Sequence, residues 1–222
     1  MRYERKLLPG DRPLPEVLGI IRRHPAGFRE VYPARWVNNL YLDSPALGDY
    51  HDHVTGLPER SKCRIRWYGS LHGSVEAPRF EWKFKQGAVS GKRAHPLPPL
   101  ELNGGIDDSM LRRMINGAAA KNPLQDRLDA RQPSLVNRYR RHYFESADGA
   151  IRLTVDSDLG FFSPDRTADS AMIPAPRDSR VVIELKYHPE AAGRAAKIAS
   201  EFPWRLARCS KYVLGIEATH RT

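Results

Sequence analysis

The sequence lacks the features of several common protein classes. It contains only two cysteines, Cys63 and Cys209, so it predicts no disulfide framework, and both thiols are expected to pack as small apolar groups. It has no run of about 18 apolar residues, which argues against a membrane-spanning helix. The charged start Met1–Lys6 lacks the apolar stretch of a secretion signal, so we expect a cytoplasmic protein.

Familiar catalytic signatures are also missing. We find no Ser-His-Asp or Cys-His nucleophile pattern and no spacing typical of zinc sites. The segment Gly87–Arg93 resembles a phosphate-binding P-loop only superficially, because its glycines are one residue too close and Arg93 stands at the Ser/Thr position. His51 and His53 could ligate a metal, although two histidines in a short loop are more often surface residues.

Acidic residues are outnumbered by basic ones. The 222 residues include 36 Lys and Arg against 26 Asp and Glu, which gives a formal charge of +10. A basic excess favours polyanionic partners, namely nucleic acid, anionic lipid or phosphate chains. The apolar content of 41% is enough for the core of one large domain. Composition alone does not choose between the partners, so the positions of the charges matter.

Much of this charge lies where ionic and apolar residues alternate. In the segment Lys62–Trp67, cations at the even positions alternate with apolar residues at the odd positions. A period of two predicts a β-strand, because successive side chains leave opposite faces. Three further segments follow the same pattern: residues 80–85, 151–156 and 183–187.

The remaining elements follow from apolar periodicity and from turn residues. Strands are expected at residues 2–7, 35–43, 60–68, 79–86, 134–145, 150–156, 180–187 and 206–216. Helices are expected at residues 15–24, 110–116, 123–130 and 188–200. Connections or loops are expected at residues 44–58, 69–78, 87–99 and 161–177. Hairpins dominate this order, which predicts a mainly antiparallel sheet.

Two arrangements of these strands are open. One is a sandwich with a charged outer surface. The other is a closed barrel with a charged lumen and an apolar outside that helices cover. In that barrel the apolar face of Cys63, Ile65 and Trp67 would pack under helices such as 15–24 or 189–200. Four strands with almost purely ionic faces favour convergence on one place. We therefore predict an α+β fold, an eight-stranded antiparallel closed tunnel barrel that forms a single domain over residues 1–222.

Lys62, Arg64 and Arg66 give the strongest single signal for binding. Two like charges about 4 Å apart repel by roughly 4 kcal/mol at an effective dielectric constant of 20, so three on one strand face require an anion or water to screen them. Arginine suits phosphate through its paired donors, and lysine adds a point charge. The pattern favours a phosphate or oxyanion site, with a solvated basic face as the alternative.

Carboxylates stand among the cations of the alternating segments. They are Glu4 near Lys6, Glu81 near Lys83 and Lys85, and Glu184 near Lys186. Carboxylates beside phosphate-binding cations are useful if a divalent metal bridges protein and phosphate. Internal salt bridges explain the same residue types equally well.

The sequence resembles the polyphosphate-polymerase domain of the vacuolar transporter chaperone (VTC) family, within the triphosphate tunnel metalloenzyme superfamily. The resemblance rests on short segments that appear in the order of the family and cover nearly the whole chain. They are residues 3–6, 41–44, 60–69, 81–83 with Lys92, 139–141, 152–156, 183–186 and 210–212. No single segment is specific to this family, whereas the ordered set of segments is.

This resemblance implies a basic tunnel in which ATP, with Mn²⁺ or Mg²⁺, extends inorganic polyphosphate. In such a tunnel we expect Arg64 and Arg66 to point into a central cavity shared with Lys83 and Glu184. The implied catalytic, phosphate-binding cations are Lys6, Arg64, Arg66, Lys83, Arg141 and Lys211. Further implied contacts are Lys92, Tyr139, Arg208 and Ser210, to which the strand pattern adds Lys62, Lys85, Arg152 and Lys186. The implied metal ligand is Glu184, with Glu4 and Glu81 as weaker candidates.

Two other functions remain open. Hydrolases of the superfamily often begin with Glu-x-Glu-x-Lys, and Arg2 at the first of these positions suits the polymerase branch better. An inorganic or nucleoside triphosphatase would use the same tunnel with water as nucleophile, and a non-catalytic module would only bind polyanions. We expect ATP and polyphosphate or triphosphate as partners and no nucleic acid. Coupling to transport would need a separate membrane protein.

Overall fold

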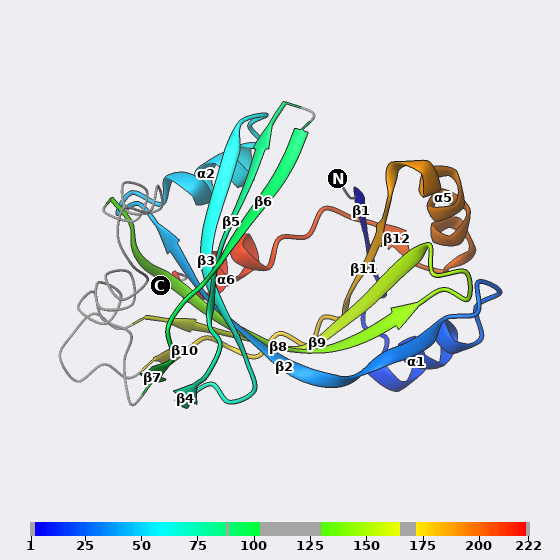
Figure 1. The fold of residues 1–222 in the computed structure, drawn as a ribbon, viewed down its shortest axis with the longest axis horizontal. Helices are drawn as coiled ribbons and strands as arrows, with labels where there is room; N and C mark the ends of the chain where they lie inside the picture. The colour runs from blue at the N-terminus through cyan, green and yellow to red at the C-terminus, as the bar shows by residue number, and fades with distance from the viewer. Residues whose placement is uncertain (1–2, 88, 103–129, 165–171, 221–222) are drawn as a thin grey trace. The chain divides into compact units, whose positions relative to one another are not determined.

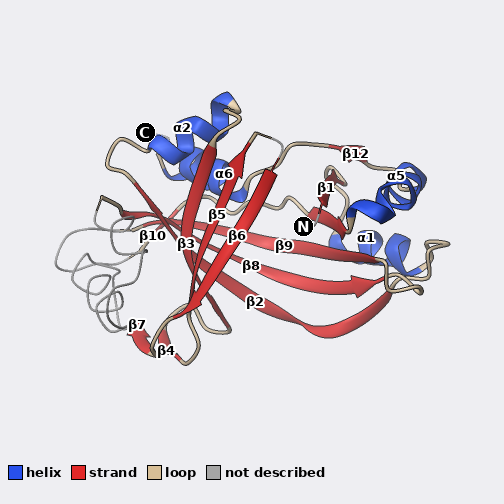
Figure 2. Cartoon of the chain, turned by 45° about the horizontal axis from the view of Figure 1, so that its top comes forward, coloured by secondary structure: helices blue, strands red, loops and turns tan. Residues whose placement is uncertain are grey.

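The computed structural model describes residues 3–87, 89–102, 130–164 and 172–220. Strands dominate these residues, together with four α-helices and one short 3₁₀ helix (Figure 2). The chain divides into two compact units. Unit 1 comprises Met1–Trp36, Tyr139–Leu159 and Arg177–Cys209, and unit 2 comprises Val37–Arg138, Gly160–Pro176 and Ser210–Thr222.

The elements are labelled as in Figure 1. The described strands are β1 (Tyr3–Leu8), β2 (Arg29–Asp43), β3 (Arg60–Tyr68), β4 (Gly73–Val75), β5 (Arg79–Gln86), β6 (Val89–Pro96), β7 (Leu100–Leu102), β8 (Gln132–Glu145), β9 (Ile151–Ser163), β10 (Ile173–Pro174), β11 (Val182–Tyr187) and β12 (Arg205–Leu206). The described helices are α1 (Leu14–Arg22), α2 (Gly48–Thr55), η1 (Pro189–Ala191), α5 (Ala192–Glu201) and α6 (Lys211–Thr219).

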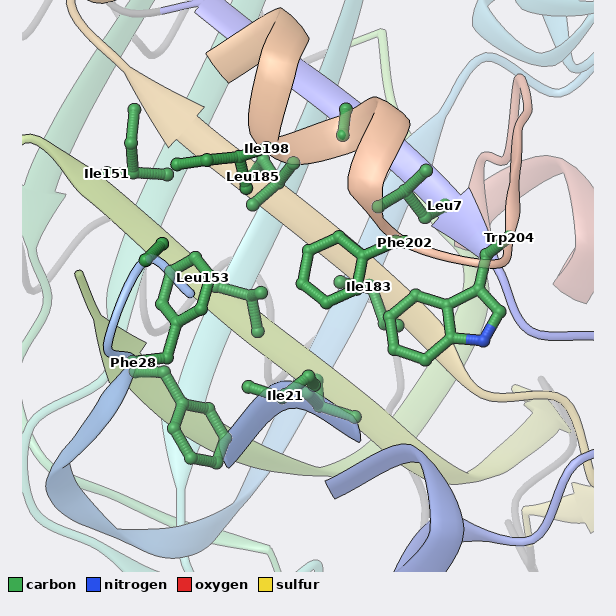
Figure 3. Packing of buried hydrophobic residues seen from close by; sticks show 14 of the residues in the cluster. Leu7, Ile21, Phe28, Ile151, Leu153, Ile183, Leu185, Ile198, Phe202 and Trp204 are labelled. Atoms are coloured by element: carbon green, nitrogen blue, oxygen red, sulfur yellow. The ribbon is translucent and has the colours of Figure 1, made fainter. Parts of the chain in front are cut away.

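In unit 1, β1 pairs with β11, and β11 pairs with β9, all antiparallel. Strand alternation turns Leu7, Ile183 and Leu185 to one face, where they are fully buried against Ile21 of α1 and Ile198 of α5 (Figure 3). The other face of the same strands therefore carries the ionic residues. The helices at 15–24 and 188–200, predicted from apolar periodicity, are confirmed as α1 and as η1 followed by α5.

In unit 2, β2, β3, β5 and β6 are successive antiparallel neighbours. Cys63, Ile65 and Trp67 of β3 are buried in a second core, which Val75 of β4 and Leu102 of β7 help to close. The sequence pattern led us to expect this apolar face under the helices at 15–24 or 189–200. That expectation is wrong, because the apolar residues of α1 and α5 belong to the core of unit 1.

The strand count differs from the prediction. Among the described residues the main sheet has ten strands instead of eight, in the order β12-β1-β11-β9-β8-β2-β3-β5-β6 with β10 paired to β9, and β4 and β7 form a separate pair. The α+β class and the antiparallel pairing are confirmed. In the described part of the chain no pairing joins β6 to β12, so closure of the barrel stays a prediction.

Several predicted connections contain regular structure. The loop expected at 87–99 is mostly strand β6, the connection at 44–58 contains α2, and the hairpin loop at 69–78 contains β4. The loop expected at 161–177 includes the end of β9 and the strand β10. The helices predicted at 110–116 and 123–130 lie outside the described residues, apart from Ala130, which is in a turn.

The last predicted strand, at 206–216, is wrong. Only Arg205–Leu206 is a strand, and α6 begins at Lys211. The Ser210 side chain caps this helix by accepting a hydrogen bond from the backbone N–H of Val213. Tyr212 and Ile216, four residues apart, are both buried, which is the spacing of one helix face. An apolar run of this length is compatible with a strand or with a helix. The Ser210 cap favours the helix.

Candidate functional site

The ionic face of β3, β5 and β6 is dominated by cations. Its strand register places Arg60 opposite Lys85, Lys62 opposite Lys83, Arg64 opposite Glu81 and Arg66 opposite Arg79, and Lys83 is also opposite Lys92 of β6. Directly paired residues project from the same face of a sheet. We call these nine residues the cationic face. It has eight cations and one carboxylate, so its charge is strongly unbalanced.

Glu81 is the counterion within the cationic face. Its Oε2 atom accepts hydrogen bonds from Nε and Nη2 of Arg64 at 2.7 and 2.5 Å, and its Oε1 atom accepts one from Lys92. Arg66 lies 3.8 Å from the same carboxylate. Burial would raise the pKa of Glu81, but Arg64, Arg66 and Lys92 hold that pKa well below its usual value. Both oxygens are engaged by cations, so Glu81 acts as a counterion in this structure.

Arg66 is held by a neutral partner as well. Its Nε atom donates to Oδ1 of Asn39 at 2.8 Å, and Nδ2 of Asn39 donates to Oδ1 of Asn137 at 2.7 Å. The buried Nδ2 atom of Asn137 has no hydrogen-bond partner among the described residues. A buried unsatisfied amide of this kind is a donor that a bound oxyanion or water can use.

In unit 1, three cations lie around the carboxylate of Glu184. The Glu184 carboxylate lies 2.8 Å from Nζ of Lys186, 3.3 Å from Nη2 of Arg141 and 3.8 Å from Nζ of Lys6. Lys6 also lies 3.3 Å from Glu4 and donates to the carbonyl oxygen of Cys209 at 2.5 Å. We call Glu4, Lys6, Arg141, Lys186 and Glu184 the Glu184 cluster.

Arg141 is the most constrained cation of this cluster. It forms two parallel hydrogen bonds with the fully buried Asp156, from Nε at 2.6 Å and from Nη2 at 2.7 Å. Burial would lower the pKa of Arg141, but Asp156, Tyr139 and Glu184 raise it well above its ordinary value. The guanidinium therefore stays charged and fixed in orientation.

The Glu184 cluster suits a divalent metal only if substrate phosphates and water supply further ligands. The described residues contain no group of three or more His, Cys, Asp or Glu side chains placed to hold a metal by themselves. Mg²⁺, however, is commonly bound by one or two carboxylates together with substrate phosphates and water. Glu184 and Glu4 supply two carboxylates beside Lys6, and the buried hydroxyl of Thr154, opposite Glu184 in the register, has no hydrogen-bond partner among the described residues.

The remaining predicted site residues belong neither to the cationic face nor to the Glu184 cluster. The Cζ atom of Arg141 lies 5.2 Å from the ring centroid of the buried Tyr139. Arg152 is an exposed partner of Glu145, and Arg208 is exposed between β12 and α6. Lys211 is the first residue of α6 and not part of a strand, and its side chain is buried.

Strand register groups several of the predicted site residues on one face. The register brings Lys62, Lys83, Lys85 and Lys92 onto one face with Arg64 and Arg66. The expectation that Arg64, Arg66 and Lys83 share a cavity with Glu184 concerns both units and stays a prediction.

Some residues of the candidate site were missed from the sequence. Arg79 precedes the segment that we recognised, yet it shares the parity of Glu81, so extending the alternating pattern by one step would have found it. Asn39 and Asn137 contact each other from 98 positions apart and carry no local signal. Asp156 was noted only as part of a strand, and its bond to Arg141 depends on how β8 and β9 pair.

Comparison with known families gives one match over nearly the whole chain. The model of the VTC domain matches residues 1–220. This confirms the resemblance that the ordered segments indicated. A search of proteins with curated functions found no match.

Solved structures of similar fold are distant in sequence. A proposed adenylate cyclase of Vibrio parahaemolyticus is 12% identical with a TM-score of 0.53, and the match covers 96% of this chain and 97% of that chain. A protein of Pyrococcus horikoshii OT3 is 15% identical with a TM-score of 0.52, covering 98% and 99%. A proposed adenylyl cyclase of Hippeastrum, described as having a dominant triphosphatase activity, is 14% identical with a TM-score of 0.53, covering 99% and 97%. These identities show a shared fold alone.

The described helices are all short. None of them is long and apolar enough to cross a membrane.

Proposed function

The chain belongs to the VTC-domain family, and we propose that it is a metal-dependent phosphotransferase that uses ATP to extend inorganic polyphosphate. The observation that carries this proposal is the cationic face, where eight cations surround one carboxylate. Like charges directly opposite each other destabilise a sheet. A bound chain of phosphates would remove that repulsion and would use the arginine donors in pairs.

Phosphoryl transfer passes through a loose transition state, so the protein contributes mainly by positioning and by stabilising charge. We assign Arg64, Arg66, Lys83 and Lys92 to the phosphate oxygens of the substrate. Arg64 is oriented by Glu81, and Arg66 by Asn39, so both guanidinium groups are pre-organised before binding. In the other unit, Arg141 is oriented in the same way by Asp156.

The nucleophile in this reaction is the terminal phosphate of the growing chain. It is already ionised, so the reaction needs no protein base, which agrees with the absence of a nucleophile–base pattern in the sequence. Glu184, with Glu4 as a second ligand, would hold Mn²⁺ or Mg²⁺. A bound ion would supply positive charge that offsets the negative charge developing on the phosphates during transfer.

Two variants test the proposed roles. Arg66→Ala should lose both ATP binding and turnover, because it removes a cation that contacts substrate. Glu184→Ala should lose turnover while part of the ATP binding survives, because it removes the metal ligand and leaves the cations. Arg194→Ala removes an exposed cation of α5 that pairs with Asp148, and it serves as the control. Full turnover by Glu184→Ala would refute the metal role.

A triphosphatase is the second candidate. It is favoured by the Hippeastrum protein, which shares the fold and is described as having a dominant triphosphatase activity. The two reactions use the same phosphate and metal ligands and differ in whether water or phosphate attacks. The products separate them, since a hydrolase releases free phosphate and a polymerase lengthens chains. A protein that binds ATP and leaves it unchanged would be neither.

A further inference from the structure

We propose that the hydroxyl group of Thr154 is an oxygen ligand of the divalent ion assigned to Glu184, either directly or through one water molecule. The inference rests on the proposed function, because it assumes that such an ion accompanies the substrate phosphates at the Glu184 cluster. Thr154 would add an uncharged oxygen to the carboxylates of that cluster. Deleting the hydroxyl would therefore leave every charge of the site in place.

Thr154 lies on the ionic face of the sheet in unit 1. Its neighbours Leu153 and Val155 are fully buried in the core of that unit, so strand alternation turns the Thr154 side chain to the opposite face. In the strand register Thr154 is directly opposite Glu184, and Glu184 is directly opposite Lys6. These three residues form one row across β9, β11 and β1. The Cβ atoms of directly opposite residues lie about 5 Å apart, so the hydroxyl and the carboxylate can reach one ion.

The Thr154 hydroxyl is buried and makes no hydrogen bond in the described part of the chain. Thr154 is 7% exposed, and its Oγ1 atom has no hydrogen-bond partner within residues 3–87, 89–102, 130–164 and 172–220. Such a hydroxyl costs free energy of folding, which valine, a side chain of the same shape, would avoid. Buried polar atoms without a protein partner are explained by a bound water or ion, or by a part in catalysis. We therefore assign this hydroxyl to a ligand.

A hydroxyl and a carboxylate are a suitable pair of ligands for Mg²⁺ or Mn²⁺. Mg²⁺ binds oxygen atoms, retains several waters, and uses one or two carboxylates together with substrate phosphates. In P-loop NTPases the protein ligands of the ion are a Ser or Thr hydroxyl and an aspartate. Thr154 and Glu184 present the same two chemical groups from neighbouring strands.

The carboxylate nearest to Thr154 on the same face of β9 has another partner. Asp156 lies two residues further along the strand and accepts two hydrogen bonds from Arg141, through Oδ1 at 2.6 Å and through Oδ2 at 2.7 Å. Because both of its oxygens bind one guanidinium group, Asp156 acts as the counterion of Arg141. The Thr154 hydroxyl is thus the side-chain oxygen of β9 that lies directly opposite Glu184.

Titration calorimetry with the β,γ-imido analogue of ATP, which resists transfer of its terminal phosphate, tests the proposal. The analogue is titrated with Mn²⁺, and again with a chelator in place of Mn²⁺, into the wild-type protein, Thr154→Val and Thr154→Ser. With Mn²⁺ we expect Thr154→Val to bind about tenfold more weakly than the wild-type protein, a loss typical of disturbed metal sites. With the chelator the two proteins should bind equally well. Thr154→Ser keeps the hydroxyl and should keep most of the affinity.

Thermal unfolding of the ligand-free protein gives a second readout. The melting temperature of Thr154→Val should rise by about 2–4 °C, because the variant no longer buries an unsatisfied hydroxyl. Thr219→Val is the control with the same substitution outside the candidate site. The Thr219 hydroxyl donates to the carbonyl oxygen of Gly215 at 2.8 Å, so its loss should lower the melting temperature and leave binding of the analogue unchanged.

Each outcome decides a different statement. Equal affinities of the wild-type protein and Thr154→Val with Mn²⁺ would overturn the role of Thr154 and leave the proposed function standing. An equal loss with Mn²⁺ and with the chelator would overturn it too, because the hydroxyl would then contact the phosphates. A lower melting temperature of Thr154→Val would show that the hydroxyl serves the fold, for example through an ordered water, and would likewise overturn its role. A wild-type protein that binds no analogue under either condition would overturn the proposed function itself.

Discussion

The hydroxyl of Tyr212 donates a hydrogen bond to the Oδ2 atom of Asp43, which lies 169 residues earlier in the chain. The carboxylate of Asp43 is fully buried and also accepts the backbone N–H groups of Asp49 and Tyr50, both at 3.0 Å. One carboxylate therefore joins the first turn of α2 to α6 within unit 2. Because Lys211 begins α6, this contact also fixes the position of a predicted phosphate-binding cation.

We predict that Tyr212→Phe destabilises the protein by about 1–3 kcal/mol, since a buried carboxylate loses a charge-assisted hydrogen bond. Burial, together with Asp43, raises the pKa of Tyr212, so its hydroxyl is a donor at every pH of practical use. Urea unfolding measures the effect. The control is Tyr32→Phe at an exposed position, which should change the free energy of unfolding by less than about 0.5 kcal/mol. Equal effects of the two variants would contradict the role of the Asp43 contact.

Two helical glycines should respond to alanine in opposite directions. A Cβ atom at Gly215 of α6 would lie 2.3 Å from Cδ2 of Leu135 and 2.7 Å from Cδ1 of Phe161, so Gly215→Ala should cost about 1–3 kcal/mol through overpacking. A Cβ atom at Gly193 of α5 would meet nothing within 4 Å. Gly193→Ala should therefore leave stability unchanged or raise it by up to about 0.5 kcal/mol. Thermal unfolding of the two variants gives the comparison, and a neutral Gly215→Ala would contradict the close packing of α6.

Two arginine–carboxylate pairs of unit 1 differ in burial. Arg141 binds the fully buried Asp156 through two donors, whereas Arg152 binds Glu145 at an exposed site at 3.2 Å. We predict that Arg141→Lys costs about 3 kcal/mol or more, because it breaks the paired geometry around a buried charge. Arg152→Lys should cost less than about 1 kcal/mol. Chemical denaturation at low and moderate salt distinguishes them, and similar losses would show that burial of Asp156 does not matter.

Protonation of His53 should destabilise the fold as the pH falls. The pKa of His53 is about 4 in the folded protein and about 6.5 in an unfolded chain. The folded state thus binds fewer protons between these values, so this contribution to stability is complete above about pH 6.5 and declines toward pH 4. The free energy of unfolding of His53→Gln should fall less steeply than that of the wild-type protein between pH 6.5 and 5. Equal slopes for His53→Gln and the wild-type protein would contradict this role of His53.

The alternating segments gave the most accurate predictions because burial of their apolar residues and solvation or pairing of their ionic residues favour the same strand. Strands 60–68 and 79–86 have the predicted bounds, since their apolar residues form a core while their ionic residues occupy the opposite face. The same parity placed Lys62, Arg64, Arg66 and Lys83 on one surface. A period of two therefore shows which residues share one face of a strand, although not what that face contacts.

Other elements depend on contacts that no local pattern records. Strand β6 includes Ser90 and Gly91, which are poor strand formers, and it forms because it pairs with β5. Gly91 is required there, since a Cβ atom would lie 2.2 Å from the ring of Phe84. Helix α2 has no apolar stripe of its own and begins where the Asp43 carboxylate accepts its backbone N–H groups. In the same way, the Asn39–Asn137 contact follows only from the pairing of β2 with β8.

The most direct test of the central claim is the fate of the γ-phosphate of ATP. Purified protein is incubated with ATP and Mn²⁺, and the reaction is followed by phosphorus nuclear magnetic resonance, which separates free phosphate, ATP and the internal phosphates of a chain. The proposed function predicts that the signal of internal chain phosphates grows as ATP is converted to ADP. ATP that stays unchanged, or that yields only free phosphate, would contradict it.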